Sequence, residues 1–253
     1  MSSYAYLDEK KTKIVYAEDC SADDCNKDFY CSTINCHAVV RLSAVGSDKR
    51  RPYFREKVIG SHIPECIPTA SSYRPTDYDE DSFSLNLLIG KYLLPSSGKT
   101  SSTTGNRSIR GDGHKRPIES LLTLYYVLKS LTPSQHYNTY LVSDLLIDGR
   151  LRNFEIDKLC GVRLIECILM YYSKEEMRFY AKNAINSEIN IMLQFSDQKL
   201  FEIFKNFYFN QRKKSITNQI SVLIADWKAK ELKGGKYLAG NIVKRSAMVV
   251  PKE

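Results

Sequence analysis

Two short-spaced pairs of metal-binding residue types lie in the first quarter of the chain, and they constrain its fold more than any other feature. Cys31 and Cys36 stand in the segment CSTINC, and His62 and Cys66 stand in HIPEC. Thiolates and imidazoles are ligands that zinc prefers, and two such pairs on separate turns can close a tetrahedral structural site. A first unit of about 60 residues has little apolar surface to bury, so a metal would help to hold it together. We therefore predict a structural Zn²⁺ bound by Cys31, Cys36, His62 and Cys66.

Other residues could enter this site, and the ligand set stays open at this point. Cys20 and Cys25 form another Cys-x4-Cys pair that could replace either predicted pair, and His37 follows Cys36 directly. Alternatively, these cysteines are ordinary, partly buried thiols. The seven cysteines are an odd number, and the N-terminus lacks the apolar run of a signal peptide. Both features favour metal binding and free thiols over a disulfide framework, and we expect a cytoplasmic protein.

The excess of basic residues is concentrated in two segments. The formal net charge is +8, and residues 199–253 carry 12 basic and 4 acidic groups, while residues 97–117 carry 5 and 1. Such a focused basic region is typical of proteins that bind a polyanion, most often nucleic acid. A basic face that only keeps the protein soluble has the same composition, so this alternative stays open. No stretch approaches the roughly 18 apolar residues of a membrane span, and we expect no membrane partner.

The pattern along the chain predicts a zinc-ribbon-like unit over residues 1–68, which opens with a hairpin formed by YAYLD and KIVYAED. Residues 69–116 are expected to form a connector that contains a flexible, basic loop rich in Ser, Thr and Gly. Residues 117–253 are expected to form a helix followed by a barrel domain. The helix is predicted from the apolar stripe of PIESLLTLYYVLKSL, with proline suited to its first turn.

The order of elements in the last part of the chain predicts a small β-barrel. Three strand-like segments, VRLIECILMYYS, EMRFYAKN and EINIMLQFS, precede a helical segment with Ser196 as its expected N-cap. The apolar residues expected to share one face of this helix are Leu200, Ile203, Phe204, Phe207 and Tyr208. Two further strand-like segments follow. This order is similar to the oligonucleotide/oligosaccharide-binding (OB) barrel, which carries a helix between its third and fourth strands.

The segments AYLDEKKTKIVYAEDC, FYCSTINCHAVVRL, RRPYFREK and HIPEC carry a family resemblance. They resemble the N-terminal zinc-ribbon region of competence-type CoiA proteins, in which Cys31 and Cys36 would be the knuckle cysteines. The chain departs from that pattern in its knuckle spacing, with four intervening residues rather than two. It also has Tyr53-Phe54 where the family has His-Phe. The resemblance implies a zinc ribbon and a mobile-element or phage-defence setting.

The same family carries a restriction-type nuclease domain after the ribbon, which makes a metal-dependent nuclease one alternative function. Such a site needs an aspartate and a glutamate on neighbouring strands to hold a divalent ion. The candidate catalytic residues for this alternative are Glu119, Asp144 and Glu155. The water-orienting residue should lie two positions after the glutamate, where this chain has Asp157, and Lys158 comes one position too late. The sequence therefore favours a protein without catalytic activity.

Aromatic and basic residues alternate in the C-terminal part of the chain. Proteins that bind single strands combine stacking aromatic rings with a cationic groove. In the segment EMRFYAKN, strand alternation places one tyrosine and two basic residues on the same face. The residues predicted to contact nucleic acid are Arg178, Tyr180, Lys182, Arg212, Lys213 and Lys214. Alternatively, the tyrosines lie at the edge of the core and the lysines only solvate the surface.

We therefore predict a cytoplasmic α+β protein in which a zinc-ribbon-like unit, a linker and a helix precede an OB-like five-stranded barrel with one helix. The predicted function is non-catalytic nucleic-acid binding, with single-stranded DNA or RNA as the ligand. The alternatives are the nuclease and a protein-interaction subunit of a larger assembly.

Overall fold

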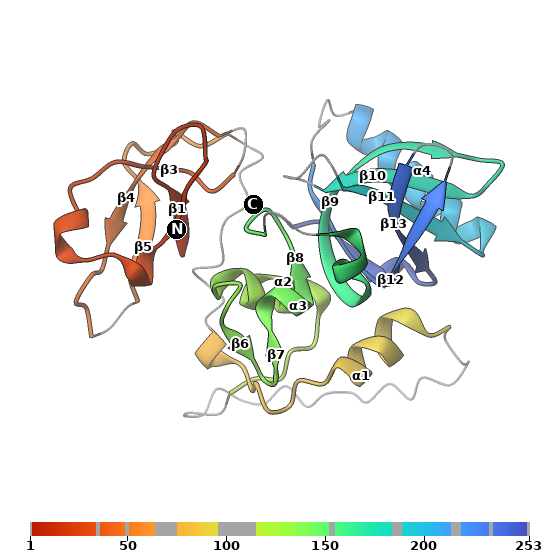
Figure 1. The fold of residues 1–253 in the computed structure, drawn as a ribbon, viewed down its shortest axis with the longest axis horizontal. Helices are drawn as coiled ribbons and strands as arrows, with labels where there is room; N and C mark the ends of the chain where they lie inside the picture. The colour runs from red at the N-terminus through yellow and green to blue at the C-terminus, as the bar shows by residue number, and fades with distance from the viewer. Residues whose placement is uncertain are drawn as a thin grey trace.

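The computed structural model describes most of the chain. The described residues are 2–33, 36–48, 51–63, 75–95, 115–151, 155–183, 189–213, 219–232 and 235–251. They form a mixed α+β protein with a small N-terminal sheet on one side and a closed barrel on the other (Figure 1). Short helices and strands lie between the two. Among the described helices, none combines the length and the hydrophobicity needed to cross a bilayer.

The N-terminal sheet contains five antiparallel strands in the order β2-β1-β3-β4-β5. Its strands are β1 (Tyr4–Tyr6), β2 (Ile14–Tyr16), β3 (Phe29–Tyr30), β4 (Val39–Ser43) and β5 (Tyr53–Glu56). The predicted hairpin is confirmed, because β1 and β2 pair with Tyr4 opposite Tyr16. A small core lies on one face of the sheet, where the rings of Phe29 and Phe54 pack with their centroids 4.8 Å apart. The zinc-ribbon-like interpretation of this unit stays a prediction.

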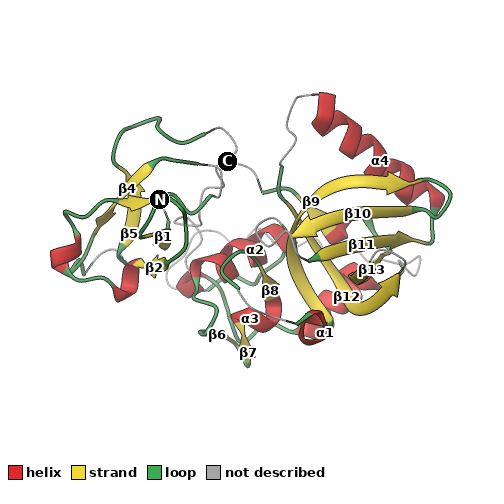
Figure 2. Ribbon diagram, turned by 45° about the horizontal axis from the view of Figure 1, so that its top comes forward, coloured by secondary structure: helices red, strands yellow, loops and turns green. Residues whose placement is uncertain are grey.

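The middle of the chain forms short elements next to the barrel, and some of them lie between the barrel and the N-terminal sheet (Figure 2). They are α1 (Leu85–Leu88), a π-helical turn (Ile89–Leu93), α2 (Leu121–Ser130), β6 (His136–Tyr137), β7 (Tyr140–Leu141), α3 (Val142–Leu145) and β8 (Leu146–Ile147). The predicted helix is α2, but it begins at Leu121 rather than at Pro117. Ser120 is its N-cap, because the Ser120 hydroxyl accepts a hydrogen bond from the backbone N–H of Thr123 at 3.0 Å.

The barrel is closed by five long strands, as the sequence predicted. They are β9 (Gly161–Ser173), β10 (Arg178–Asn183), β11 (Asn190–Phe195), β12 (Ser221–Leu232) and β13 (Gly235–Ile242). The strands pair in the order β9-β10-β11-β13-β12, and β12 pairs again with β9 to close the ring. The β11–β13 pair is parallel and the other pairs of the ring are antiparallel. This closed five-stranded arrangement is compatible with an OB-like fold. Strand β8 pairs with β9, and β14 (Met248–Val249) pairs with β12.

The predicted helix between the third and fourth barrel strands is α4 (Gln198–Lys213). Its buried residues are Leu200, Phe201, Phe204, Tyr208 and Gln211. Their aromatic rings pack against barrel residues such as Phe179 and Phe195, so α4 covers part of the barrel core. Two details of the prediction were wrong. Asp197 rather than Ser196 caps the helix, since its carboxylate accepts a hydrogen bond from the N–H of Leu200 at 2.9 Å, and Ile203 is 42% exposed.

Candidate metal centre and nucleic-acid interface

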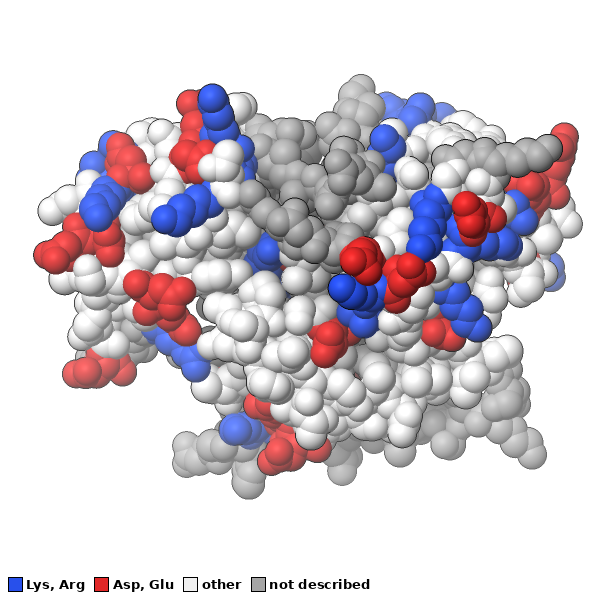
Figure 3. Space-filling model, viewed as in Figure 1, with Lys and Arg blue, Asp and Glu red and all other residues white. Residues whose placement is uncertain are grey.

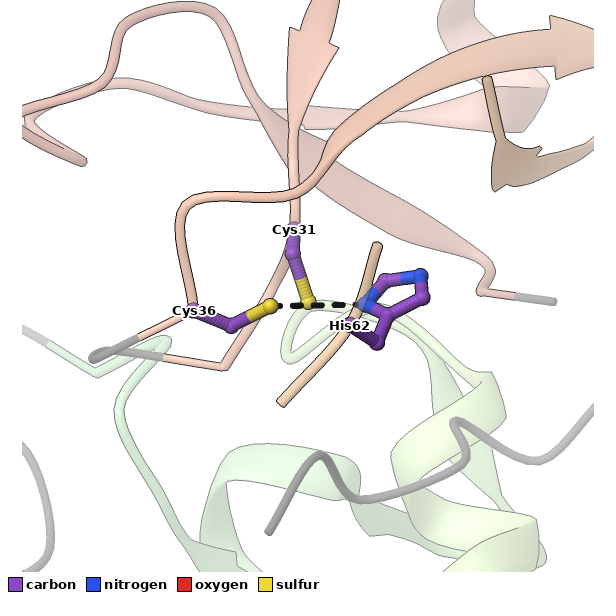
Figure 4. Close-up of side chains that lie close together, drawn as sticks. All are labelled: Cys31, Cys36 and His62. Carbon is purple, nitrogen blue, oxygen red and sulfur yellow. Dashed lines mark hydrogen bonds between the residues drawn. The ribbon is translucent and has the colours of Figure 1, made fainter. Parts of the chain in front are cut away.

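Three of the four predicted zinc ligands converge at the edge of the N-terminal sheet (Figure 4). Cys31 directly follows β3, Cys36 lies in the loop before β4, and His62 follows β5. Both cysteines are buried and the histidine is half-buried. A backbone hydrogen bond stabilises the loop between the two cysteines, because the N–H of Cys36 donates to the carbonyl of Thr33 at 3.1 Å. The sheet therefore brings together residues that lie about 30 positions apart in the sequence.

The spacing of these ligand atoms fits a zinc ion. The two sulfur atoms and the imidazole nitrogen all lie within 4.8 Å of one another, and Cys36 Sγ is 3.4 Å from His62 Nδ1. With Zn–S bonds of about 2.3 Å and Zn–N bonds of about 2.0 Å, a tetrahedral site has an S···N edge of about 3.5 Å. The N–H of Thr33 points at Cys31 Sγ at 3.4 Å, a contact that stabilises a thiolate. Cys31, Cys36 and His62 can thus hold a metal ion.

A lysine ties the ligand loop to the first hairpin. The Lys11 ammonium donates a hydrogen bond to the carbonyl of Cys36 at 2.8 Å and another to the carbonyl of Thr33. Lys11 lies in the turn between β1 and β2 and has a positive φ of 56°. The position of the ligand loop therefore depends on the hairpin as well as on the strands that carry the ligands.

The alternative ligands lie apart from this cluster. The Cys20 thiol donates to the carbonyl of Tyr16 at 3.3 Å, and burial raises its pKa to about 11, which favours the protonated thiol. Both Cys20 and Cys25 pack against the core of the N-terminal sheet. His37 is exposed, and its Nδ1 lies 3.2 Å from a carboxylate oxygen of Glu9. Cys66, the predicted fourth ligand, lies outside the described residues.

The predicted nucleic-acid platform lies on the outer face of the barrel. In β10, Phe179 and Ala181 point into the core, while Arg178, Tyr180 and Lys182 alternate with them and point outward. The ring of Tyr180 stacks on the ring of Tyr171 in β9, with centroids 4.7 Å apart and planes at 19°. Lys182 is exposed beside them. The structure therefore gives this segment the orientation that strand alternation predicted.

Arg178 and Lys182, at the two ends of this segment, differ in their contacts. Arg178 Nη1 lies 2.8 Å from Glu176, which also accepts a hydrogen bond from the Tyr180 hydroxyl at 3.1 Å. Arg178 Nε is a buried donor with no hydrogen-bond partner in the described part of the chain, so a water or a ligand oxygen could satisfy it. Arg178 thus forms an ion pair with Glu176, whereas Lys182 forms no ion pair with the described residues.

The other three predicted contact residues are at or just beyond the end of α4. Arg212 and Lys213 are exposed. The Arg212 guanidinium carbon lies 4.8 Å from the centroid of the Tyr208 ring, and the guanidinium donates to the carbonyl of Met170 at 3.1 Å. Met170 directly precedes Tyr171 in the sequence. Lys214 lies outside the described residues.

The residues named for a nuclease do not form a shared metal site in the described part of the chain. There, the Cys31, Cys36 and His62 cluster is the one group of three or more suitable side chains close enough to hold an ion. Asp144 lies 3.8 Å from Arg163, and Glu155 lies 3.6 Å from Lys158. Glu119 lies in an exposed stretch before α2, where its backbone carbonyl accepts a hydrogen bond from Lys91.

A buried cluster of four charges joins α2, β9 and the segment after β8, and the sequence analysis did not find it. We call Lys129, Asp148, Arg150 and Glu166 the charge quartet. Lys129 Nζ lies 2.9 Å from Asp148 and 2.6 Å from Glu166, and Arg150 Nε lies 2.8 Å from Asp148. All four side chains are buried, and the Tyr125 hydroxyl donates to Glu166 at 2.7 Å. Two cations face two anions, so the quartet is neutral.

The electrostatics of the charge quartet favour its ionised form. Burial by itself would raise the pKa of Asp148, but Arg150 and Lys129 outweigh burial and hold that pKa below its usual range. Burial would likewise lower the pKa of Lys129, but Asp148 and Glu166 raise it well above its usual value. Every charge in the quartet has a partner of opposite sign, as is expected of a structural ion-pair network.

Tyr4 connects the charge quartet to the N-terminal sheet. Its ring centroid lies 5.7 Å from Lys129 Nζ and 5.5 Å from the Arg150 guanidinium carbon. Tyr4 is only 2% exposed, although Ala5 rather than Tyr4 belongs to the core of its own sheet. The N-terminal sheet therefore packs against the middle of the chain through this cation–π contact.

Charges of both signs are mixed on the face of the molecule that Figure 3 shows. Figure 3 shows basic and acidic side chains interspersed on this face of the molecule, over both the N-terminal sheet and the barrel. This face therefore carries no broad field of one sign among the described residues.

Comparisons of this chain with protein-family models, with curated proteins and with solved structures find no match. The resemblance of the first quarter to CoiA-like proteins thus stays a prediction.

Proposed function

We propose that the protein binds nucleic acid without cleaving it, through the outer face of its barrel, with single-stranded DNA or RNA as the ligand. One observation carries the proposal: the stacked rings of Tyr171 and Tyr180 lie on the outer face of a closed five-stranded barrel, and Tyr171 is 54% exposed there. Exposed aromatic rings beside cations are the means by which proteins hold unpaired bases.

The topology of the barrel supports this proposal. We infer that the barrel is of the OB type, because its third and fifth strands are parallel neighbours, its first and fourth strands close it, and α4 lies between the third and fourth. OB barrels commonly bind oligonucleotides on the face that includes their second and third strands. In this chain those strands are β10 and β11, and Tyr180 lies on the first of them.

We further propose that the N-terminal unit carries a structural zinc ion. The S···N spacing of 3.4 Å between Cys36 and His62 supports zinc, and Cys66 is the proposed fourth ligand. A closed site of four protein ligands leaves no position for a reacting water, so its role would be to stabilise the unit. The CoiA-like resemblance and the predicted cytoplasmic, mobile-element or phage-defence setting belong to this proposal.

Binding to labelled oligonucleotides at two salt concentrations tests the proposed function. We expect the full chain to bind a single strand at physiological salt and to prefer it over a duplex competitor of the same length. A parallel incubation with Mg²⁺ should leave the oligonucleotide uncut. Binding that salt abolishes equally for every polymer would refute the proposal, because that is the behaviour of a generic basic surface.

Metal analysis of the same sample tests the zinc proposal. We expect about one zinc ion per chain. Cys36→Ser should lose the metal and lower the melting temperature, while Cys20→Ser should keep the metal. Equal zinc content in the two variants would show that Cys36 is not a ligand.

A further inference from the structure

A third tyrosine extends the Tyr171–Tyr180 stack across the barrel. The ring of Tyr237, in β13, meets the ring of Tyr180 edge-to-face with centroids 5.9 Å apart and planes at 68°. We call Tyr171, Tyr180 and Tyr237 the tyrosine row. It joins the first, second and fifth strands of the barrel, although its members lie up to 66 positions apart in the sequence.

The strand register explains why all three rings lie on the outer face. Tyr180 pairs with Met192 in β11, and Met192 pairs with Ala239, two residues after Tyr237 and on the same face of β13. Leu238, between them, is buried in the barrel core. In β9 a bulge lies opposite Tyr180 and Ala181, and it brings Tyr171 into register with Tyr180. The row is thus a product of strand pairing and does not depend on a loop.

The tyrosine row lies on a packed support and is open to solvent at one end. Met192, the cross-strand neighbour of Tyr180 on the same face, is fully buried. Tyr180 and Tyr237 are half-buried, whereas Tyr171 is 54% exposed. One ring face of Tyr171 is occupied by Tyr180, so its exposed surface could accept a further planar group in the stack.

Lysines flank the tyrosine row. Lys182 lies two residues after Tyr180, and Lys230 is the direct cross-strand partner of Tyr237. Both lysines are exposed, and no carboxylate among the described residues forms an ion pair with either of them. The neighbouring Lys228 lies 3.9 Å from Asp226. The row therefore offers aromatic faces for bases and two exposed cations for phosphates, a combination that suits an anionic chain with unpaired bases.

The geometry points to the tyrosine row as a base-stacking site for single-stranded nucleic acid, in which Tyr171 and Tyr237 stack bases and Lys182 and Lys230 contact the backbone phosphates. This inference rests on the proposed function and gives it a specific site. Because every base has an aromatic face and a lysine contacts any phosphate, the site would bind single strands with little dependence on base sequence.

An abasic strand separates stacking from phosphate binding. Two labelled strands of equal length are compared at physiological salt with the full, zinc-loaded chain: oligothymidylate and a sugar–phosphate strand that lacks bases. We expect the base-bearing strand to bind more tightly by at least about fivefold, the lower end of what one stacked base contributes. Equal affinity for the two strands would overturn the inference while leaving nucleic-acid binding itself intact.

Variants of the tyrosine row make the test specific to these rings. Tyr171→Ala and Tyr237→Ala should each weaken binding of oligothymidylate by about fivefold or more and leave binding of the abasic strand unchanged. Tyr53→Ala is the matched control, because Tyr53 lies on β5 of the other sheet. Tyr237→Leu serves as a second variant that keeps apolar bulk if the alanine variant unfolds. Loss of oligothymidylate binding in the control but not in the row variants would overturn the inference.

Variants of the flanking lysines report on the phosphate contacts. Lys182→Ala and Lys230→Ala should weaken binding of both strands equally and should each reduce the slope of affinity against salt by about one phosphate contact. If the slope of affinity against salt is unchanged in both variants, the lysines do not contact the phosphates. A protein that binds neither strand would overturn the proposed function together with this inference.

Discussion

Replacing Lys129 by methionine would test whether the charge quartet holds the middle of the molecule together. Lys129 Nζ lies 2.9 Å from Asp148 and 2.6 Å from Glu166, and the lysine side chain is only 3% exposed. Methionine fills most of the volume of lysine but carries no charge. In the described part of the chain, Glu166 would keep the Tyr125 hydroxyl as its side-chain partner. Its carboxylate would stay buried with no cation at ion-pair distance, because Arg150 pairs with Asp148.

The expected loss of stability follows from this burial. Removing one partner from a buried ion pair costs about 3–5 kcal/mol, because the remaining charge has neither water nor a counter-ion. For a chain of this size, each kcal/mol lowers the melting temperature by about 2–4 °C, so the variant should melt about 6–20 °C below the wild type. Urea unfolding followed by circular dichroism measures the free energy, and a thermal scan measures the melting temperature.

An exposed ion pair provides the matched control. Lys158 lies 3.6 Å from Glu155, and both side chains are 73% exposed. Lys158→Met should change the free energy of unfolding by less than about 0.5 kcal/mol, since water screens this pair. If Lys129→Met stays within about 1 kcal/mol of the wild type, the reasoning about the quartet is refuted.

The pH dependence of stability gives a second test of the charge quartet. The pKa of Asp148 is lower in the folded protein, because Arg150 and Lys129 outweigh the opposing effect of burial. Such a carboxyl contributes stability that is fully present above its unfolded pKa of about 3.9 and is lost as the pH falls through the folded pKa. Without Lys129 this contribution shrinks, so the gap in stability between wild type and Lys129→Met should narrow from pH 7 to pH 3. A gap that widens on acidification would contradict this assignment.

Three further predictions concern other parts of the molecule. Gly240→Ala should destabilise the barrel by about 1–3 kcal/mol in urea unfolding, because the new Cβ would lie 2.8 Å from ring carbons of Trp227. An unchanged midpoint of urea unfolding would mean that the strands can move apart. Tyr4→Ala should speed amide hydrogen exchange in α2, because it removes the ring over Arg150, while exchange in β10 and β11 should not change. Burial raises the pKa of the Cys20 thiol to about 11. Alkylation of Cys20 by iodoacetamide should therefore be slow at pH 8 and should accelerate towards pH 11. Fast alkylation of Cys20 at pH 8 would contradict this prediction.

The sequence predicted the local features of this protein well. The order of three strands, a helix and two strands follows from hydrophobic periodicity, and the structure has these elements as β9 to β13 with α4. Strand alternation alone placed Tyr180 and Lys182 on the same outward face. Residue chemistry and spacing marked Cys31, Cys36 and His62 as candidate metal ligands, and the structure brings these three side chains close enough together to hold an ion. In each case, the information is carried by neighbours along the chain.

Features that depend on long-range pairing were decided only by the tertiary structure. Parallel pairing of β8 with β9 brings Asp148 close to Glu166, and no local sequence pattern marks these two residues as neighbours. Closure of the barrel brings Tyr237 to Tyr180, and no local pattern marks Tyr237 as different from a core-edge tyrosine. The N-cap and the buried face of α4 also differ from the sequence prediction. Packing against the barrel determines which face of this helix is buried. Periodicity fixes which side of an element is apolar, but register and closure between distant strands determine which side chains meet.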